Sequence, residues 1–598
     1  MRYHLVTTAL EETWPKDEPI LFLGEWCRRY SRKDSWLNYT AEVLPYHWDD
    51  RSKLYTDYQY LQDLYEKLLT ELSVQLNHIH GVNFSLRYWR ILVGPWLGYF
   101  IQILFDRWFS LQQAIDNYQL SGTVVLTGKE GSFIPNDMSE FSQLILSDSW
   151  NHHIYSVILQ KYTQVPQVKK EWEEDKNKSD GQKVFTWKYR FKKIIVNSYS
   201  RVAKLFVRDT DAFFLATYLP VFDELRLYLK FFQVPQRWNV VDVDKVKEDF
   251  SLRHWNLEGE SHSEFEFYAR TLISKNIPKA YLEGFNKLIY KTENLVWPQC
   301  PKIIWTSNAY SSDDVFKAWA ATKTEQGVPL VIGQHGGGHG SHLWGFHEEH
   351  QLAICDYFLS WGWTENNQPN VVPVGELNSK RPTGINHSKE QKLLLITCAL
   401  PRQSYHLYSV IVSRQWLDYF EDQCQFVEHL PSSLQDALTV RTYLHDYGWD
   451  QGMRWKERFP NLDIDDGYSN LDRLIKQSRI NVSTYNATTF LESFSMDVPT
   501  VIFWNPNHWE LRESAIPFFE ELKKVGIFHE TPESAADHIA TIWDDVNKWW
   551  YDPEVRKVLA KFKNRYCQLP EDLLCRVEGV LKTAINESKH YQSNINNR

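Results

Sequence analysis

Apolar residues recur along this chain at two spacings, one typical of helices and one typical of short buried strands. Between residues 58 and 76 the apolar positions are 61, 64, 65, 68, 69, 72 and 76, which is the spacing of one helical face. Short apolar runs bounded by turn residues predict strands at 20–24 and 123–128. The run 91–105 is shorter than the ~18–20 residues that cross a bilayer, so it predicts a buried helix.

From about residue 300 the pattern becomes a regular alternation of strands and helices. Strands are predicted at 302–305, 330–332, 357–360, 392–397, 440–443, 479–483 and 499–504. Residues 313–324 predict a helix that Ser311 or Ser312 caps, and the closing helices start at 537–549. Such alternation predicts parallel sheets with helices on both faces.

A chain of 598 residues exceeds what one hydrophobic core supports. We predict an α/β fold of two Rossmann-like domains that face each other across a cleft, with helical additions in the N-terminal half. The expected units are an N-terminal acceptor-side domain at 1–370, a C-terminal nucleotide-donor domain at 385–575 and a C-terminal helix or tail at 576–598. The stretch 366–382 predicts the crossing between domains, and the charged stretch 167–183 predicts a solvent loop or an insertion.

Charge and cysteine usage narrow the class of protein. The net charge is −10 and both signs are mixed along the chain, which argues against a nucleic-acid partner. The basic and aromatic run 188–193 suits a phosphate or lipid headgroup, or a solvated face. Seven scattered cysteines without a CxxC pair indicate a reducing compartment. Without a secretory signal at residues 1–10, we expect a cytoplasmic protein, with peripheral contact at the inner face of the membrane as the alternative.

The most informative segment is the glycine-rich loop 333–340, which follows an apolar strand. It reads Gly333-Gln334-His335-Gly336-Gly337-Gly338-His339-Gly340. Glycine allows unusual backbone angles and close approach, and histidine exchanges a proton near neutral pH. His335 is therefore the candidate general base, a role worth ~10²–10⁴ in rate. The alternative is a histidine that only holds a turn.

A metal site is the second alternative for this region, because five histidines lie within sixteen residues. They are His335, His339, His342, His347 and His350. Residues 347–350 form an HxxH rather than the HExxH that places two ligands and a base on one helical face, so we predict no metal and no cofactor. The acidic pairs at 209–211, 242–244 and 463–465 are expected to be solvated loop or helix carboxylates.

The second candidate segment follows the strand 479–483 and is rich in hydroxyl groups. Its candidate residues are Ser483, Thr484, Tyr485, Thr488, Thr489 and Glu492. A helix that starts near Ala487 would offer free N–H groups and the positive end of its dipole to an anion. Thr488 and Thr489 could hold a donor phosphate and Glu492 a ribose hydroxyl, while a plain helix cap is the alternative.

Further residues complete the expected donor site. Gln334, Gly336 and Gly337 would line it from the glycine-rich loop. Arg402, which follows the strand 392–397, and Arg441 would add guanidinium groups that suit a phosphate.

Five motifs in this chain resemble those of a known family. They are Phe22-Leu23-Gly24-Glu25-Trp26-Cys27, the run 87–97, Gly333-Gln334-His335-Gly336-Gly337, Phe358-Leu359-Ser360-Trp361-Gly362-Trp363, and Ser483-Thr484-Tyr485 with Thr488-Thr489-Phe490-Leu491-Glu492. The chain is similar, nearly end to end, to transferases encoded in bacterial O-antigen and surface-polysaccharide clusters, and it more distantly resembles CDP-glycerol glycerophosphotransferases and capsule Kdo transferases. The resemblance implies a GT-B-like fold, with His335-Gly336 matching the His-Gly pair that supplies the base.

The leading hypothesis is a GT-B glycosyltransferase that moves a sugar from a nucleotide donor to a glycan or lipid-linked glycan acceptor. A CMP-linked nonulosonic or Kdo-like sugar is the donor we expect. The alternatives are a polyol-phosphate transferase with a CDP-linked donor, a sugar-nucleotide epimerase on the same fold, and a non-catalytic glycan-binding protein. Only the 26 tryptophans favour the last of these, and large cores explain them as well.

Overall fold

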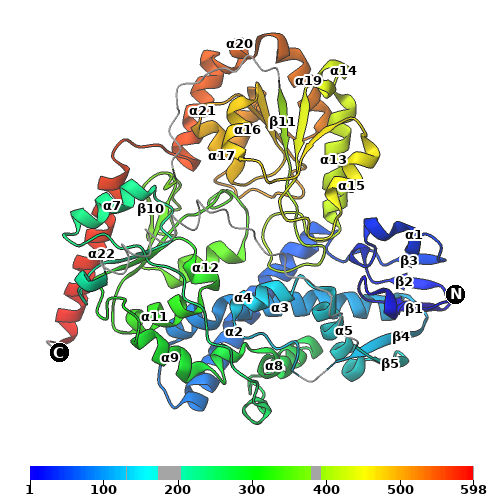
Figure 1. Cartoon of the computed structure of the whole chain (residues 1–598), viewed down its shortest axis with the longest axis horizontal. Helices are drawn as coiled ribbons and strands as arrows, with labels where there is room; N and C mark the ends of the chain where they lie inside the picture. Colours follow the sequence, from blue (N-terminus) through cyan, green and yellow to red (C-terminus); the bar gives the residue numbers. More distant parts are fainter. Residues whose placement is uncertain (129–130, 173–203, 379–391, 597–598) are drawn as a thin grey trace.

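In the part of the chain that the structure describes, helices flank three parallel β-sheets (Figure 1). The structure, a computed structural model, describes residues 1–128, 131–172, 204–378 and 392–596. The N-terminal sheet contains β1 Tyr3–Val6, β2 Ile20–Phe22, β3 Ala41–Val43, β4 Leu120–Thr127 and β5 Gln167–Glu171. The middle sheet contains β6 Phe213–Leu215, β7 Ile304–Thr306, β8 Leu330–Gly333, β9 Tyr357–Ser360 and β10 Val371–Pro373. The C-terminal sheet contains β11 Leu393–Ile396, β12 Leu438–Arg441, β13 Asp463–Asp465, β14 Ile480–Ser483, β15 Thr500–Phe503 and β16 Phe528–His529.

Strand order determines where a ligand can bind. The C-terminal sheet has the order β13-β12-β11-β14-β15-β16, which is the 3-2-1-4-5-6 order of doubly wound nucleotide-binding sheets. Its order reverses between β11 and β14. The N-terminal sheet, with the order β3-β2-β1-β4-β5, reverses between β1 and β4, whereas the middle sheet runs in simple sequence from β6 to β10. Ligands bind beyond the carboxyl ends of the strands at such reversals.

The helices of the first two thirds of the chain surround the N-terminal and middle sheets. They are α1 Lys33–Trp36, α2 Arg51–His80, α3 Leu86–Asn117, α4 Met138–Leu144, α5 Asp148–Tyr162, α7 Val221–Lys230, α8 Glu264–Asn276, α9 Phe285–Glu293, α10 Ala309–Ser312, α11 Asp314–Glu325 and α12 Phe346–Ile354.

The remaining helices belong mainly to the C-terminal sheet. They are α13 Gln415–His429, α14 Ser432–Asp436, α15 Gln451–Arg458, α16 Leu471–Gln477, α17 Thr488–Ser495, α18 Ile516–Lys524, α19 Pro532–Ile542, α20 Val546–Trp550, α21 Pro553–Tyr566 and α22 Leu573–Asn596.

The predicted α/β fold class is confirmed, but the number of sheets is three rather than two. Of the N-terminal strands, β2 lies within the predicted run 20–24 and β4 overlaps the predicted run 123–128. A separate N-terminal sheet was not predicted, because two helices of 30 and 32 residues, α2 and α3, separate β3 from β4. The loop predicted at 167–183 is wrong at its start, since residues 167–171 form the edge strand β5. Residues 173–183 and the basic run 188–193 lie outside the described part of the chain.

Helix α3 joins the N-terminal and middle sheets. It is buried along most of its length, as its apolar composition predicts, and it packs against α2, α5, α8, α11 and α12. A Cβ atom on Gly98 would lie 2.0 Å from the Phe346 ring, so this glycine lets α12 approach α3 closely. Because α12 follows the glycine-rich loop, this contact fixes one end of that loop to the core.

Local signals account for the helix ends. The Asp50 carboxylate accepts hydrogen bonds from the N–H groups of Ser52 and Lys53 at the start of α2, and Gly81 ends the helix in the left-handed region with φ of 65°. The predicted cap of α11 was wrong, since Asp313 rather than Ser311 or Ser312 accepts from the Phe316 N–H at 3.0 Å.

The last helix returns to the middle sheet. Helix α21 packs on α17 and α18 beside the C-terminal sheet, and α22 then packs on α7 and β9 of the middle sheet (Figure 1). The Tyr357 hydroxyl on β9 donates to Glu587 Oε2 of α22 at 2.5 Å. The middle and C-terminal sheets are therefore linked by two chain crossings. Among the described helices, none is both long and apolar enough to cross a membrane.

Candidate active site between the middle and C-terminal sheets

The two segments singled out in the sequence meet in the structure. The glycine-rich loop follows β8 of the middle sheet, and the hydroxyl-rich segment follows β14 of the C-terminal sheet. The Gly337 N–H donates to Thr488 Oγ1 at 2.8 Å, and His342 Nε2 lies 3.0 Å from the Asn486 carbonyl oxygen. The carboxyl ends of β8 and β14 thus face each other, which is the arrangement expected of a GT-B-like fold.

Two kinds of constraint explain the glycines of this loop. Gly338 and Gly340 adopt φ of 90° and 68°, where a side chain is disfavoured. A Cβ atom on Gly337 would lie 2.4 Å from the carbonyl carbon of Ala487 and 2.7 Å from the Thr488 nitrogen. A Cβ on Gly336 would lie 3.1 Å from Thr488 Oγ1. Gly336 and Gly337 therefore lack side chains because the start of α17 occupies that space.

Both ends of the Gln334 side-chain amide form hydrogen bonds inside the protein. Its Oε1 accepts from the Trp361 N–H and from Trp363 Nε1, both at 2.9 Å, and its Nε2 donates to the Gly336 carbonyl at 2.9 Å. The side chain is only 1% exposed. This amide ties the glycine-rich loop to the Trp361–Trp363 turn after β9, so the structure places it behind the loop rather than at its surface.

His335 lies in a partly buried aromatic pocket. Burial, together with the charges of His339 and His347, lowers its pKa to about 3, against the opposing effect of a hydrogen bond to the Ser307 backbone. Its Nδ1 is buried and has no hydrogen-bond partner among the described residues. The imidazole is therefore neutral at neutral pH, with a ring nitrogen that is not engaged by the protein.

Two tyrosines beside His335 were missed in the sequence. The rings of Tyr218 and Tyr310 lie 6.0 and 6.5 Å from that of His335. Tyr218 has φ of 67°, an uncommon conformation for a tyrosine that clusters at functional sites, and its hydroxyl accepts from Asn308 Nδ2 at 3.1 Å. Both tyrosines follow strands of the middle sheet, β6 and β7. Strand β6 has three residues, too few for a periodic signal.

The other four histidines of the region have separate structural partners. His339 Nε2 lies 2.9 Å from Gln351 Oε1, and His347 Nε2 forms a hydrogen bond with the Tyr99 hydroxyl. His350 is 4% exposed and contacts the aromatic rings of Phe346 and Tyr310. Within the described ranges, no group of three or more His, Cys, Asp or Glu side chains could hold a metal ion.

The start of α17 lacks the side-chain cap that the sequence left open as the alternative to an anion site. Ala487 occupies the N-cap position, and among the described residues no side-chain cap hydrogen bond is made to the first N–H groups of the helix. Those N–H groups lack intrahelical partners, and the positive end of the helix dipole lies there. Thr488 is partly exposed at this end, and Glu492 lies one turn further along. The helix start therefore has the properties of an anion site.

The remaining residues of the segment are more deeply placed. Thr484 is 1% exposed and donates to the Ile396 carbonyl at 3.0 Å, which ties β14 to β11. Ser483 is 1% exposed and its hydroxyl has no hydrogen-bond partner among the described residues. The Tyr485 hydroxyl pairs with Thr489 Oγ1 at 2.7 Å. Tyr443, which follows β12, is 39% exposed near this edge and was not identified from the sequence.

The two arginines already have carboxylate partners. Arg402 Nη2 donates to Asp148 Oδ2 at 2.9 Å and a second nitrogen donates to the Trp26 carbonyl, so Arg402 joins the C-terminal and N-terminal sheets. It lines a cavity of about 690 Å³ between them. Arg441 Nη1 donates to Asp465 Oδ1 at 2.5 Å on the neighbouring strand. Among the described residues, neither arginine forms a hydrogen bond to Gly337 or to Thr488.

The acidic pairs contribute to structure. Residues 463–465 were expected in a loop or helix but form the edge strand β13, because Asp463 and Asp465 are held by Thr439 and Arg441 of β12. Asp211 accepts from the Arg208 N–H at 3.0 Å, and Asp244 pairs with Lys291 at 2.6 Å.

The fold and the site define an α/β protein whose candidate site lies between the carboxyl ends of two parallel sheets. The chain belongs to the LIC12162 transferase family, whose model matches residues 3–575. The predicted transferase class is thereby confirmed. None of the curated proteins compared with the chain matches it significantly.

Several solved structures match parts of the chain at low similarity. The wall teichoic acid polymerase TagF has 10% identity and a TM-score of 0.27 over 50% of this chain and 85% of its own. Acinetobacter baumannii MurG has 11% identity and a TM-score of 0.31 over 62% and 91%. WaaG, a glycosyltransferase involved in lipopolysaccharide biosynthesis, has 10% identity and a TM-score of 0.28 over 50% and 95%.

Proposed function

We propose that this protein is a glycosyltransferase that moves a sugar from a nucleotide donor to a surface-polysaccharide or O-antigen acceptor. The proposal rests on membership of a transferase family and on the site between the middle and C-terminal sheets. The observation that carries it is the hydrogen bond of 2.8 Å between the Gly337 N–H and Thr488 Oγ1. That contact joins the loop of the candidate base to an uncapped helix start that suits a phosphate.

His335 is the proposed general base. A neutral imidazole can accept the proton of an acceptor hydroxyl as that oxygen attacks the anomeric carbon of the donor. The bond from that carbon to the nucleotide phosphate breaks in the same step, and the phosphate leaves with the electron pair. Since burial lowers the pKa of His335 to about 3, the base remains unprotonated at neutral pH.

The donor phosphate is assigned to the start of α17. Its uncapped N–H groups would stabilise the negative charge that develops on the leaving phosphate. Thr488 and Thr489 would support them with hydroxyl groups, and Tyr485 and Glu492 would contact the nucleoside. Ser483 and Thr484 lie beneath this surface, and Gln334, Gly336 and Gly337 shape the opposing loop.

We propose that Arg402 and Arg441 belong to the donor side of the site. Each would act indirectly, by holding a loop in place. Each guanidinium is paired with a carboxylate, Asp148 or Asp465, at the carboxyl edge of the C-terminal sheet. Each would therefore position backbone around the donor.

We propose that the reaction needs no metal, so that activity persists in EDTA. We also propose that it takes place in the cytoplasm at the inner face of the membrane, where the enzyme would meet a lipid-linked acceptor.

A thermal-shift panel of CMP, CDP, UDP, GDP and dTDP tests this proposal. If the donor is a CMP-linked nonulosonic or Kdo-like sugar, we expect CMP alone to raise the melting temperature. If a polyol phosphate is transferred from a CDP-linked donor, we expect both CDP, which carries the donor's diphosphate, and the leaving nucleotide CMP to raise it. Thr488→Val should reduce that shift. The matched control is Thr56→Val, since Thr56 is exposed and its hydroxyl donates only within α2, to the Ser52 carbonyl. If no nucleotide changes the melting temperature, the transferase mechanism proposed here is wrong.

A further inference from the structure

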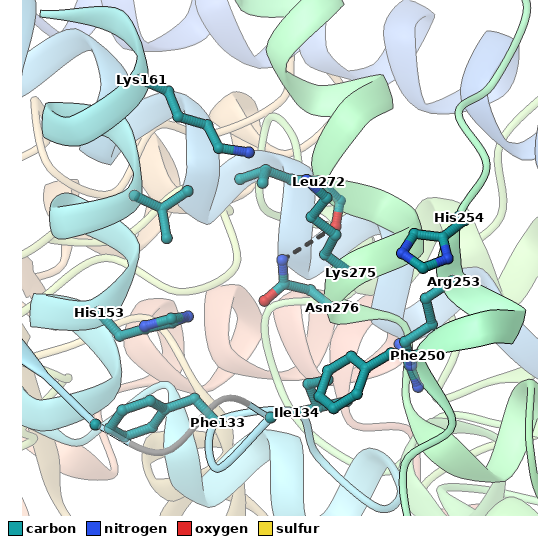
Figure 2. A pocket seen from close by; sticks show the side chains of 13 residues that line it. Phe133, Ile134, His153, Lys161, Phe250, Arg253, His254, Leu272, Lys275 and Asn276 are labelled. Carbon is teal, nitrogen blue, oxygen red and sulfur yellow. Dashed lines mark hydrogen bonds between the residues drawn. The ribbon is translucent and has the colours of Figure 1, made fainter.

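A cavity of about 360 Å³ lies at the N-terminal sheet and shares no lining residue with the His335 site. Its walls come from the carboxyl end of β4, from α5, from α8 and from the segment around Phe250 (Figure 2). The order of the N-terminal sheet reverses between β1 and β4. The cavity therefore opens beside a strand end where doubly wound sheets bind ligands. Its volume falls within the range of small-molecule sites.

The charged groups that line this cavity are all basic among the described residues. They are His153, Lys161, Arg253, His254 and Lys275. The charge of Arg253 is already matched, because its guanidinium donates to Glu283 at 2.6 and 2.7 Å. His153 is neutral, since burial lowers its pKa to about 4. Besides His254, the positive charge of this cavity that no carboxylate matches in the described part of the chain comes from the two lysines.

Lys161 and Lys275 lie side by side at the rim, on the last turns of α5 and α8 (Figure 2). Neither forms an ion pair with a carboxylate in the described part of the chain, and contact with Lys275 together with burial lowers the pKa of Lys161 to about 8. The negative end of each helix dipole favours a lysine there. That effect explains each lysine alone, but it does not explain why two ammonium groups converge.

The inner part of the cavity is apolar. Phe133, Val157, Phe250 and Leu272 contribute carbon surface, and the Phe133 ring stacks on the His153 ring with centroids 4.9 Å apart. Asn276 adds a polar group, although its Nδ2 donates to the Leu272 carbonyl at 3.0 Å (Figure 2). An apolar floor below a pair of unmatched cations is complementary to a molecule with one apolar and one anionic end.

We propose that this cavity is a second ligand site that binds an organic anion, a phosphate or carboxylate on a small apolar body. Lys161 and Lys275 hold the anionic group, and Phe133, Val157 and Leu272 cover the apolar body. The site is independent of the transfer reaction proposed above. An anion between the two ammonium groups would replace their mutual repulsion by two charge-assisted hydrogen bonds.

Calorimetric titration of the full chain with phenyl phosphate at pH 7 tests the proposal. We expect phenyl phosphate to bind more tightly than either inorganic phosphate or benzyl alcohol, because each of these lacks one half of the ligand. The variant Lys161→Gln/Lys275→Gln should raise the Kd at least about tenfold. Lys557→Gln, which removes an exposed charge on α21, should leave it within about twofold. Both lysines of the cavity are exposed, so the double variant should keep its melting temperature.

The proposal is overturned if phenyl phosphate fails to bind at about 10 mM, or if the double variant binds it as the wild type does. A second variant, Val157→Trp, keeps both lysines but fills the cavity, and it should abolish binding. Competition then identifies the source of the anion. Displacement of phenyl phosphate by monomeric dihexanoyl phosphatidic acid would assign the site to a lipid headgroup, and displacement by glucose 1-phosphate alone would assign it to a soluble phosphate. Either result supports an anion site.

Discussion

Replacing Gly337 by alanine tests whether the glycine-rich loop rests directly on α17. The backbone of Gly337 is outside the left-handed region, so alanine is allowed at its φ and the effect comes from contact alone. The new Cβ would lie 2.4 Å from the Ala487 carbonyl carbon, whereas ordinary contacts begin at 3.4 Å. The atoms that it meets are backbone and cannot rotate away. The loop and α17 must therefore separate by about 1 Å.

The expected penalty is that of overpacking, about 1–3 kcal/mol. The separation should also weaken the hydrogen bond from the Gly337 N–H to Thr488, which is 2.8 Å long in the structure. We expect amide hydrogen exchange to accelerate by about 5- to 150-fold in peptides that cover 331–343 and 487–495. Hydrogen exchange detected by mass spectrometry measures both peptides in one experiment.

The matched control is Gly579→Ala on α22, where a Cβ would meet no atom within 4 Å. This exposed helical glycine should tolerate alanine, with a gain of about 0.5–1 kcal/mol. The reasoning is refuted if Gly337→Ala leaves exchange in both peptides at the wild-type rate. Acceleration in the loop peptide alone would contradict the direct contact with α17.

Three further predictions concern stability. Gly98→Leu should lower the melting temperature, because the leucine side chain would collide with Phe346. Adding Phe346→Ala should recover part of the loss, and no recovery would contradict the contact between α3 and α12. Arg402→Met should destabilise the protein by about 3–5 kcal/mol, since it leaves Asp148 partly buried without its cation, and a melting temperature equal to that of the wild type would refute this. Burial lowers the pKa of His152 to about 4, so the unfolded chain binds a proton below about pH 6.5 that the folded chain rejects until about pH 4. Stability should be full above pH 6.5 and fall by about 2 kcal/mol per such histidine at pH 5, and His152→Gln should make the fall in melting temperature between pH 7 and 5 smaller than in the wild type.

The inner strands of the middle and C-terminal sheets were predictable because their apolar runs stand between clear helices, whereas β6, β10 and β16 were not predicted. Strands β9, β11, β14 and β15 lie within the predicted runs, and β8 extends one residue beyond its run, to Gly333. The charged edge strand β5 was not, because four of its five residues are exposed and no hydrophobic period marks it. Strand β13 also lacks a hydrophobic period and was not predicted. Its aspartates bond to residues of β12, which come close to them only in the folded chain.

The site was predictable at the level of segments and less so at the level of side chains. The position of His335 and Thr488 at strand ends followed from the pattern of strands and glycines. The engagement of Gln334 by Trp361 and Trp363 did not, because those partners lie more than 25 residues away in sequence. Tyr218 is distant as well, and a turn in the left-handed region brings it to His335.

The central claim is that His335 transfers the proton while the start of α17 binds the donor. Its most direct test is single-turnover transfer by His335→Gln, once the thermal-shift panel has identified the nucleotide. We expect the rate to fall by about 10²–10⁴ while the nucleotide-induced thermal shift stays unchanged. His429→Gln, at an exposed histidine on α13, should behave as the wild type. A wild-type rate for His335→Gln would contradict the account.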